Sequence, residues 1–428
     1  MANDKDFLLK NAVEVGGPTK VTLGTVTNND IDLATGNYFA DTPSGASTYT
    51  ISNAGDVQSF QLEVTGGTAE ILQNFSTTLY TGNGSTQTIT NGIDLANDGG
   101  LIWTKIRDQT GDHALMNSES SWLTELASNK TDAEGTTSYV NFVDNSNGYS
   151  MNTAAFRWNE NTREYVSWTF KKEPSFFDVV TWTGDGTTGR AISHNLGCEV
   201  GAIFVKTTSG SSNWYVYNRN LTSANYGLKL NGTDAEAFWG TGNVTDTTFS
   251  FDHQNGSGNT YVAYLFAHDD AADGLIQCGS YVSNETSPPE INLGWKPQWI
   301  LIKKTTGVDE WAIFDNVRGV VTGGNDFMLR ADTTQVEYSA ADQIDFTSTG
   351  FKLTTAGLGV TNAPTGETYV YMAIREPSDP DITWPSSIEW AGGIAPSAPA
   401  VGETDVFTLS TDDGGTSYVG VKTADNLS

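Results

Sequence analysis

The sequence predicts an all-β protein: three tandem antiparallel β-sandwich repeats, of jelly-roll type, inserted into a small terminal β domain. The composition favours strands and tight turns, because 45 glycines accompany abundant Thr, Asn and Ser while aromatic residues reach 11%. Short alternating apolar runs are bounded by Gly, Asn or Pro. The same landmarks also occur three times in the same order, which indicates an internal repeat of about a hundred residues.

The repeat is defined by a lysine, a ring side chain and a tyrosine. The lysine ends an apolar run such as "LIWTK", and the ring residue follows it by eight positions in every copy. A Tyr-Val strand such as "EYVSWTF" closes each copy, and an aromatic residue (Tyr80, Trp182 or Tyr281) opens it. Because these positions recur within one chain, we interpret them as fold determinants rather than ligand contacts. The signature residues are Lys105, His113 and Tyr165, then Lys206, Trp214 and Tyr261, then Lys303, Trp311 and Tyr369.

The domain boundaries follow from these landmarks. The three copies span residues 78–172, 177–270 and 274–376, and the junctions between them are short. Brief linkers predict modules packed in a fixed row rather than freely hinged. Residues 1–66 and 380–428 each contain only a few expected strands, which are too few to be stable alone. Each end therefore needs a partner sheet.

Bulk charge and cysteine usage exclude several classes of function. The formal net charge of −29 repels nucleic acid and anionic lipid, so we expect neither as a partner. We also expect no secretion signal and no membrane insertion, because no apolar run approaches the length of a membrane helix. The two cysteines, Cys198 and Cys278, cannot form a disulfide framework for this many domains, and we expect buried free thiols.

No catalytic motif is evident, and we predict a non-enzymatic protein without a cofactor. The four histidines lie far apart and lack zinc-ligand spacing, and there is no G-x-S-x-G nucleophile motif. A pair of carboxylates could still hydrolyse a glycan, but 51 acidic residues leave no pair identifiable from spacing. Calcium binding by acidic loops is an open alternative to ordinary turn chemistry. The candidate calcium ligands are Asp269, Asp270, Asp273, Asp412 and Asp413.

Two tryptophans are the candidate ligand-binding residues. Trp122 in "SSWLTE" and Trp239 in "AFWGTG" lie in less regular stretches flanked by Ser or Gly. Aromatic side chains in such loops can stack on sugar faces, and a row of similar modules would multiply weak affinities. The alternative is that each tryptophan anchors its loop in the protein interior.

Three parts of the chain resemble tail-fibre and appendage proteins of marine bacteriophages, including those that infect cyanobacteria. The first is "DLATGNYFADTPSGASTYTISNAGDVQSFQLEVTGG", and the second is "ITWPSSIEWAGGIAPSAPAVGETDVFTLSTDDGGTSYVGV". The third is the triplicated middle, with its "WTGDGTTGRAISHNLG" opening and "YVAYLFA" close. In the phage proteins the second part follows the first almost directly. The resemblance therefore implies that the repeats are inserted at one surface turn of a single terminal domain, where insertion costs little closure entropy.

The resemblance implies a structural protein of the virion, on the particle surface or tail, assembled in the host cytoplasm. The terminal domain would attach the chain to other virion proteins, and the repeats would project toward a host-surface glycan or protein receptor. It also implies a homo-oligomer, for which a trimer is one option. A capsid or tail decoration protein without a receptor is one alternative, and a glycan depolymerase is another. Host, receptor, oligomeric state and location on the particle are left open by the sequence.

Overall fold

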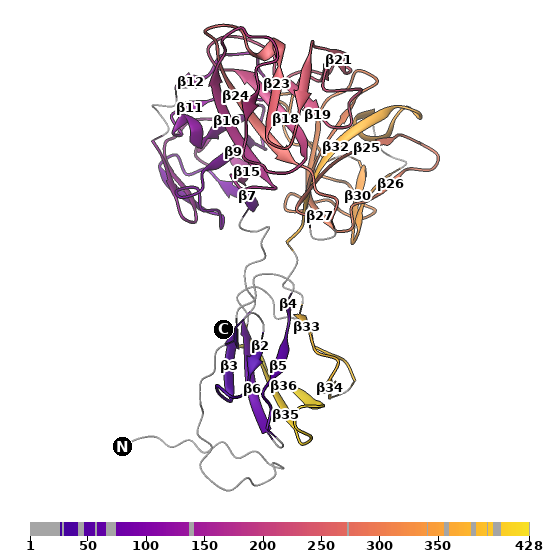
Figure 1. Ribbon diagram of the computed structural model, residues 1–428. Helices are drawn as coiled ribbons and strands as arrows, with labels where there is room; N and C mark the ends of the chain where they lie inside the picture. Colours follow the sequence, from indigo (N-terminus) through magenta and orange to yellow (C-terminus); the bar gives the residue numbers. More distant parts are fainter. Residues whose placement is uncertain are drawn as a thin grey trace. The chain divides into compact units, whose positions relative to one another are not determined.

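The computed structural model describes residues 26–27, 30–41, 47–55, 58–65, 74–136, 141–271, 274–339, 341–354, 359–377, 382–391, 393–396 and 404–427. Within them the protein is nearly all β, as predicted, and helix is limited to short turns. The chain divides into two compact units (Figure 1): unit 1 contains Met1–Ala69 and Ser378–Ser428, and unit 2 contains Glu70–Pro377. None of the helices in the described ranges is long and apolar enough to cross a membrane.

Unit 1 draws strands from both ends of the chain. These are β1 (Val26–Thr27), β2 (Asp30–Asp32), β3 (Tyr38–Asp41), β4 (Ser47–Thr48), β5 (Thr50–Ser52), β6 (Gln58–Thr65), β33 (Ile382–Thr383), β34 (Ile388–Trp390), β35 (Thr404–Thr411) and β36 (Tyr418–Leu427). The main sheet has the order β3-β6-β35-β36-β34, and β6 pairs antiparallel with β35 across its whole length. A second pairing joins β33 to β4. Phe39, Leu62 and Phe407 pack in one core, so each end supplies the partner strands that the other lacks.

Unit 2 contains three segments. Segment 1 has β7 (Phe75–Thr81), β8 (Thr86–Thr90), β9 (Gly100–Ile106), β10 (Ala114–Asn117), η1 (Ser118–Ser120), β11 (Thr124–Glu125), β12 (Gly135–Thr136), β13 (Phe142–Asn145), β14 (Gly148–Asn152) and β15 (Glu164–Lys171). Segment 2 has β16 (Phe177–Thr183), β17 (Ile192–Ser193), β18 (Val200–Thr207), β19 (Tyr215–Asn218), β20 (Tyr226–Gly227), β21 (Ala237–Phe238), β22 (Gly242–Val244), β23 (Thr248–Phe251), η2 (Asp252–Gln254) and β24 (Thr260–Ala267). Segment 3 has β25 (Ile276–Val282), β26 (Glu290–Asn292), β27 (Pro297–Lys304), β28 (Ala312–Asp315), β29 (Leu329–Arg330), β30 (Ile344–Thr347), β31 (Gly350–Leu353), α2 (Gly359–Asn362) and β32 (Thr368–Arg375).

The three segments have the same strand order. Their main sheets read β10-β9-β15-β7, β19-β18-β24-β16 and β28-β27-β32-β25, the last extended at the β28 edge by β29. Their second sheets read β8-β14-β13, β17-β23-β22 and β26-β31-β30. In segment 1, Ile102 of the main sheet and Tyr149 of the second sheet belong to the same hydrophobic core. The equivalent sheets of segment 3 share a core in the same way, through Ile300 and Phe351.

The landmarks that open and close each segment are cross-strand neighbours. Tyr80 lies opposite Tyr165, Trp182 opposite Tyr261, and Tyr281 opposite Tyr369. In each pair the rings stack with centroids 5.1 Å apart. Aromatic pairs of this kind stabilise a sheet because they bury large areas on one face. The opening and closing residues of each segment therefore fasten its first strand to its last.

The central strands of the main sheets are buried on both faces, which explains why their sequences are continuously apolar. One face covers the segment's own second sheet. The other face contacts neighbouring segments through aromatic rings. The ring centroid of Phe170 in segment 1 lies 5.5 Å from that of Phe266 in segment 2 and 6.0 Å from that of Trp299 in segment 3. Unit 2 therefore has a central aromatic core to which all three segments contribute.

Candidate functional site

The signature lysines and ring residues lie at the contact zones between segments, which we call seams. The ring residue of each segment donates a hydrogen bond from its ring N–H to a backbone carbonyl of another segment. Trp214 Nε1 donates to Ala127 O at 2.9 Å, and Trp311 Nε1 donates to Lys229 O at 2.8 Å. His113 Nε2 lies 2.9 Å from Arg330 O, which makes the same bond when that nitrogen carries the proton. Segment 2 thus contacts segment 1, segment 3 contacts segment 2, and segment 1 contacts segment 3.

Backbone hydrogen bonds repeat around the three seams at equivalent positions. The amide of a glutamate donates across each seam to the residue two positions after the signature lysine, and a second amide donates back. The first set is Glu134 N to Thr208 O, Glu236 N to Thr305 O and Glu337 N to Arg107 O, at 2.8 to 3.0 Å. The second set is Ser212 N to Thr131 O, Asp309 N to Thr233 O and Gly111 N to Thr334 O, at 2.8 to 2.9 Å. The three segments therefore form a closed ring.

The signature lysines are fully buried in the seams. Lys206 Nζ donates to Thr131 O across the seam at 3.1 Å, and Lys303 Nζ donates to Thr233 O at 3.2 Å. Lys105 Nζ donates to Ile106 O at 2.6 Å. Burial lowers the pKa of each of these three lysines to about 8. A lowered lysine pKa can mark a catalytic amine, but these ammonium groups are enclosed and bonded to carbonyls, so we assign them a positioning role.

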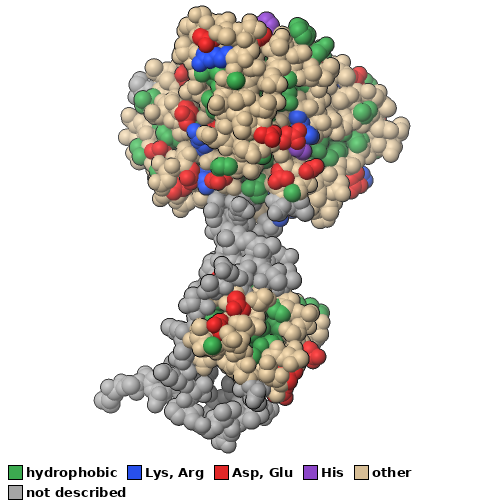
Figure 2. Space-filling model, in the orientation of Figure 1, with side chains coloured by type: hydrophobic (Ala, Val, Ile, Leu, Met, Phe, Trp, Pro, Cys, Tyr) green, Lys and Arg blue, Asp and Glu red, His purple; other side chains and the backbone are tan. Residues whose placement is uncertain are grey.

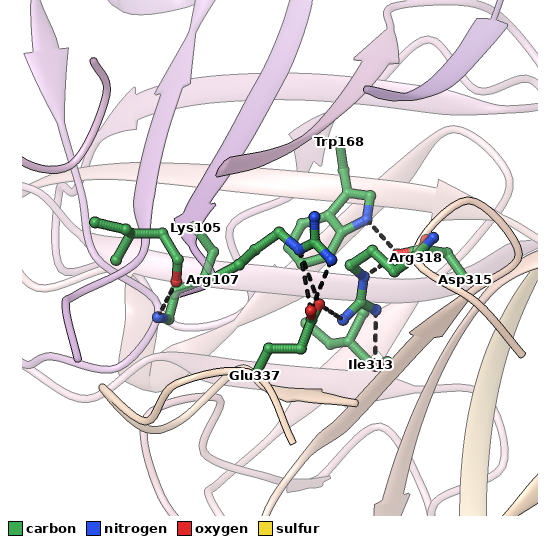
Figure 3. Close-up of polar contacts among 8 residues, drawn as sticks. Lys105, Arg107, Trp168, Ile313, Asp315, Arg318 and Glu337 are labelled. Atoms are coloured by element: carbon green, nitrogen blue, oxygen red, sulfur yellow. Dashed lines mark hydrogen bonds and ion pairs between the residues drawn. The ribbon is translucent and has the colours of Figure 1, made fainter. Parts of the chain in front are cut away.

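The seam between segments 3 and 1 also contains a buried ion network (Figure 3). Glu337 accepts from Arg107 at 2.7 Å and from Arg318 at 3.2 Å, and Arg318 pairs with Asp315 at 2.5 Å. The Arg318 side chain is fully buried, donates to Ile313 O and lies 5.4 Å from the centre of the Trp168 ring. Trp168 in turn donates its indole N–H to Asp315 at 3.0 Å. Every charged group in this network has an opposite charge within hydrogen-bond distance.

A half-buried asparagine or aspartate holds each ring residue in place. Asn129 accepts from the His113 amide at 3.1 Å, Asn231 from the Trp214 amide at 2.8 Å, and Asp332 from the Trp311 amide at 3.1 Å. Burial raises the pKa of Asp332 to about 6. Sequence analysis missed these residues, although each follows its ring residue by 16 to 21 positions in the chain.

A buried asparagine in each segment was also missed. Asn159, Asn255 and Asn362 each accept a hydrogen bond from the backbone amide of the opening loop, at 2.8, 3.3 and 2.9 Å. Each also donates from its side-chain amide back to that loop. The available signal was an asparagine six or seven positions before each closing tyrosine, but asparagine is so common in this chain that the pattern does not stand out.

A family described as a domain of unknown function (DUF7483) matches residues 72–378, which is more than half of the chain. The chain belongs to this family. The DUF7483 region begins and ends within two residues of unit 2, so the family domain contains all three segments together and leaves unit 1 outside. No curated protein matches the chain at a significant level.

Within the DUF7483 region, both candidate tryptophans pack against their own segments. Trp122 is only 7% exposed, stacks on Phe142 at 5.1 Å and donates its indole N–H to Asp144 at 3.0 Å. Trp239 is half-buried, and its ring centre lies 4.6 Å from that of Tyr215. Trp122 therefore has the contacts of a loop anchor, while Trp239 leaves part of its ring open to solvent.

The acidic loops show turn chemistry in the described residues. Asp269 accepts from the Ala271 amide, and Asp270 is exposed; Asp273 lies outside the described residues. Asp413 accepts from the Ser417 amide and hydroxyl and from Thr411, and these bonds lower its pKa to about 2. Asp412 beside it is exposed. Across the described part of the chain, no group of three His, Cys, Asp or Glu side chains is placed to hold a metal ion.

Both cysteines are free thiols. Cys278 is fully buried, with its sulfur 3.8 Å from Ala267 O, and Cys198 is half-buried. Burial raises the pKa of both thiols, which keeps them protonated and unreactive at neutral pH. The described residues around them thus offer no reactive thiolate.

Proposed function

We propose that this protein is a non-enzymatic structural component of a bacteriophage virion, a tail fibre or surface appendage that projects β modules for host-surface attachment. The observation that carries the proposal is the closed ring of seams in unit 2. The lysine and ring residue that recur in all three segments lie where the segments contact one another, so the shared architecture serves shape and rigidity. The resemblance of nearly the whole chain to phage appendage proteins supports the same function.

We further propose that the three segments are tandem β-sandwich repeats. Each pairs a main sheet with a second sheet of equivalent strand order, and in segments 1 and 3 a hydrophobic core contains residues of both sheets. The equivalent seam contacts support descent from one module. Because the DUF7483 family domain coincides with the whole ring, we regard the ring, rather than a single repeat, as the functional unit.

An exposed aromatic residue on segment 2 favours attachment over simple decoration. Phe238 is 66% exposed, and its ring centre lies 5.8 Å from that of Tyr226, its cross-strand partner. The position of Phe238 is occupied by Thr136 in segment 1 and by Ser339 in segment 3. An exposed aromatic side chain that the fold does not require is a common feature of recognition surfaces.

The expected homo-oligomer is also part of the proposal. All three seams lie within one chain, so copies of the protein would have to associate through other surfaces. Light scattering of the purified full chain gives the mass in solution, and a mass equal to one chain would remove the oligomer from the proposal.

Immunogold electron microscopy tests the proposal directly. Antibodies against the purified chain should label the tail or surface of the phage particles that carry it, and the purified chain should compete with those particles for adsorption to host cells. Particles without label would overturn the proposal.

The two alternatives give different results in the same experiments. Label on the particle without competition would indicate a decoration protein. A fall in the viscosity of host polysaccharide on addition of the purified chain would indicate a glycan depolymerase.

A further inference from the structure

Unit 1 contains a surface hollow of about 510 Å³, which is within the range of small-molecule sites. We propose that it binds a neutral sugar residue of a glycan. The residues that line it and carry the argument are Trp384, Pro385, Ser386, Glu389, Trp390 and Ala395. This inference does not rest on the virion function proposed above, because unit 1 lies outside the DUF7483 match and has its own core.

One wall of the hollow is rigid. Trp384 stacks on Tyr49 with centroids 5.7 Å apart and meets Phe407 edge to face at 4.9 Å. Its indole N–H donates to Pro396 O at 2.8 Å. A side chain held on several sides in this way loses little further entropy when a ligand binds.

Trp390 supplies the open aromatic face. Its six-membered ring lies against the backbone of Gly420, where an added Cβ would come within 2.8 Å of the ring. Trp390 is only half-buried and lines the hollow, so part of its indole is accessible to a ligand there. A flat, partly exposed indole suits a ligand with a flat apolar face.

The polar groups of the hollow restrict the ligand further. Glu389 and Ser386 are exposed: the carboxylate of Glu389 accepts hydrogen bonds, and the hydroxyl of Ser386 can donate or accept. Among the described residues that line the hollow there is no lysine or arginine. The Trp384 N–H is already bonded, and the Trp390 Nε1 atom is buried, so neither indole can donate to a ligand. Glu389 therefore favours a ligand that brings hydrogen-bond donors and carries no negative charge, and the two indoles favour a ligand with an apolar face. A neutral pyranose does this, because its C–H groups form one face and its hydroxyls form the rim.

Other occupants fit less well. A proline-rich peptide needs several donors for its carbonyls, whereas Ser386 has the one available side-chain donor among the described residues that line the hollow. An added strand needs a free edge, and turns at the two ends of β34 already use two of its backbone groups, because Ile388 N donates to Pro385 O and Gly393 N donates to Trp390 O. A quaternary ammonium group needs several aromatic faces around it. Among the described residues only two aromatic rings, those of Trp384 and Trp390, line the hollow, and the Trp384 ring is already stacked on Tyr49.

Saturation-transfer NMR on the full chain tests the inference. The probes are the methyl glycosides of glucose, galactose, mannose and N-acetylglucosamine at millimolar concentration. We expect ring C–H protons of at least one glycoside to receive saturation. Trp390→Ala should abolish that signal, and Glu389→Ala should weaken binding about tenfold.

Two further variants keep the test decisive. Ser386→Trp fills the hollow from an exposed position, so it should abolish binding without lowering the melting temperature. Phe238→Ala on segment 2 should leave binding unchanged. The inference is wrong if no glycoside is saturated, if Ser386→Trp still binds, or if Phe238→Ala removes the signal. Saturation of choline or a proline-rich peptide in place of the glycosides would also overturn it.

Discussion

The seam between segments 3 and 1 differs from the two seams between consecutive segments. All three seams share the ring N–H bond and the backbone bonds. The seam between segments 3 and 1, which we call the closing seam, adds the network of Arg107, Glu337 and Arg318. The equivalents of Arg107 in the other seams are Thr208 and Thr305. Consecutive segments are joined by a short stretch of chain that keeps them close together. Segments 1 and 3 have no such connection, so the ring closes only if noncovalent contacts hold it.

The acidic side chains elsewhere show a contrasting pattern. On the face drawn in Figure 2 they are scattered over the surface of unit 2, with smaller groups of basic side chains among them. Exposed pairs of this kind contribute little to stability. The net charge of −29 therefore favours solubility. The few buried ions at the closing seam are the charges that affect stability.

Removing Glu337 should have the largest effect. Glu337→Ala leaves Arg107 and the fully buried Arg318 without their shared carboxylate, so the free energy of unfolding of unit 2 should fall by about 3 kcal/mol. Urea denaturation with fluorescence detection measures this. Glu236→Ala is the matched control, because Glu236 occupies the same position in a consecutive seam and bonds the exposed Thr222. The control should lose under about 1 kcal/mol, and equal losses would show that the closing seam is not special.

Replacing the ring donors should have the next largest effect. Trp214→Phe and Trp311→Phe each leave a seam carbonyl without its donor, which should cost about 1–3 kcal/mol. His113→Phe should cost more than either, because Trp103 also donates its indole N–H to His113 Nδ1 at 2.8 Å. The same denaturation experiment compares the three variants. A smaller loss of stability in His113→Phe than in the other two variants would contradict the assigned contacts.

The closing seam should also be the one that acid weakens first. Burial, assisted by the charge of Lys105, lowers the pKa of His113 to about 3 from an ordinary value of 6.5. The unfolded chain therefore takes up a proton below pH 6.5 that the folded chain refuses, and stability should fall by up to about 1.4 kcal/mol per pH unit below that value. Measuring unfolding between pH 6.5 and 5 tests this.

The control for the acid prediction is the double variant His113→Trp with Trp103→Phe. It gives the closing seam the same two aromatic residues as the seam between segments 1 and 2, where Trp214 and Phe204 occupy these positions. Its stability should change less with pH in this window. An unchanged slope would assign the acid sensitivity to other groups.

The smallest expected effect concerns a gap in the seam between segments 2 and 3. Trp168 and Tyr264 bond across their seams to Asp315 and Asn117, but segment 3 has Met372 at the equivalent position. Met372 and Asn218 line a cavity of about 10 Å³. Met372→Tyr should place a hydroxyl near Asn218 and raise stability by under about 1 kcal/mol. A loss of more than about 1 kcal/mol would show that the site is too tightly packed to accept the ring.

Sequence reasoning found the elements because their signals are local. Strand composition, turn residues and the eight-residue spacing between lysine and ring are all read within short windows of the chain. The nearly all-β prediction is confirmed. The buried asparagines were missed because a hydrogen bond such as that between Asn83 and Asn159 joins residues 76 positions apart.

The sequence by itself determined that the protein is made of strands and that three stretches share one pattern of lysine, ring and tyrosine. Only the tertiary structure decided what those residues do. The local sequence around Lys206 and Trp214 would look the same whether these side chains face a ligand or a neighbouring segment. Nothing local therefore distinguishes the two roles. Ring closure depends on contacts such as Arg107 with Glu337, which are 230 residues apart. Such a pairing follows from how the segments pack, and no pattern within either stretch specifies it.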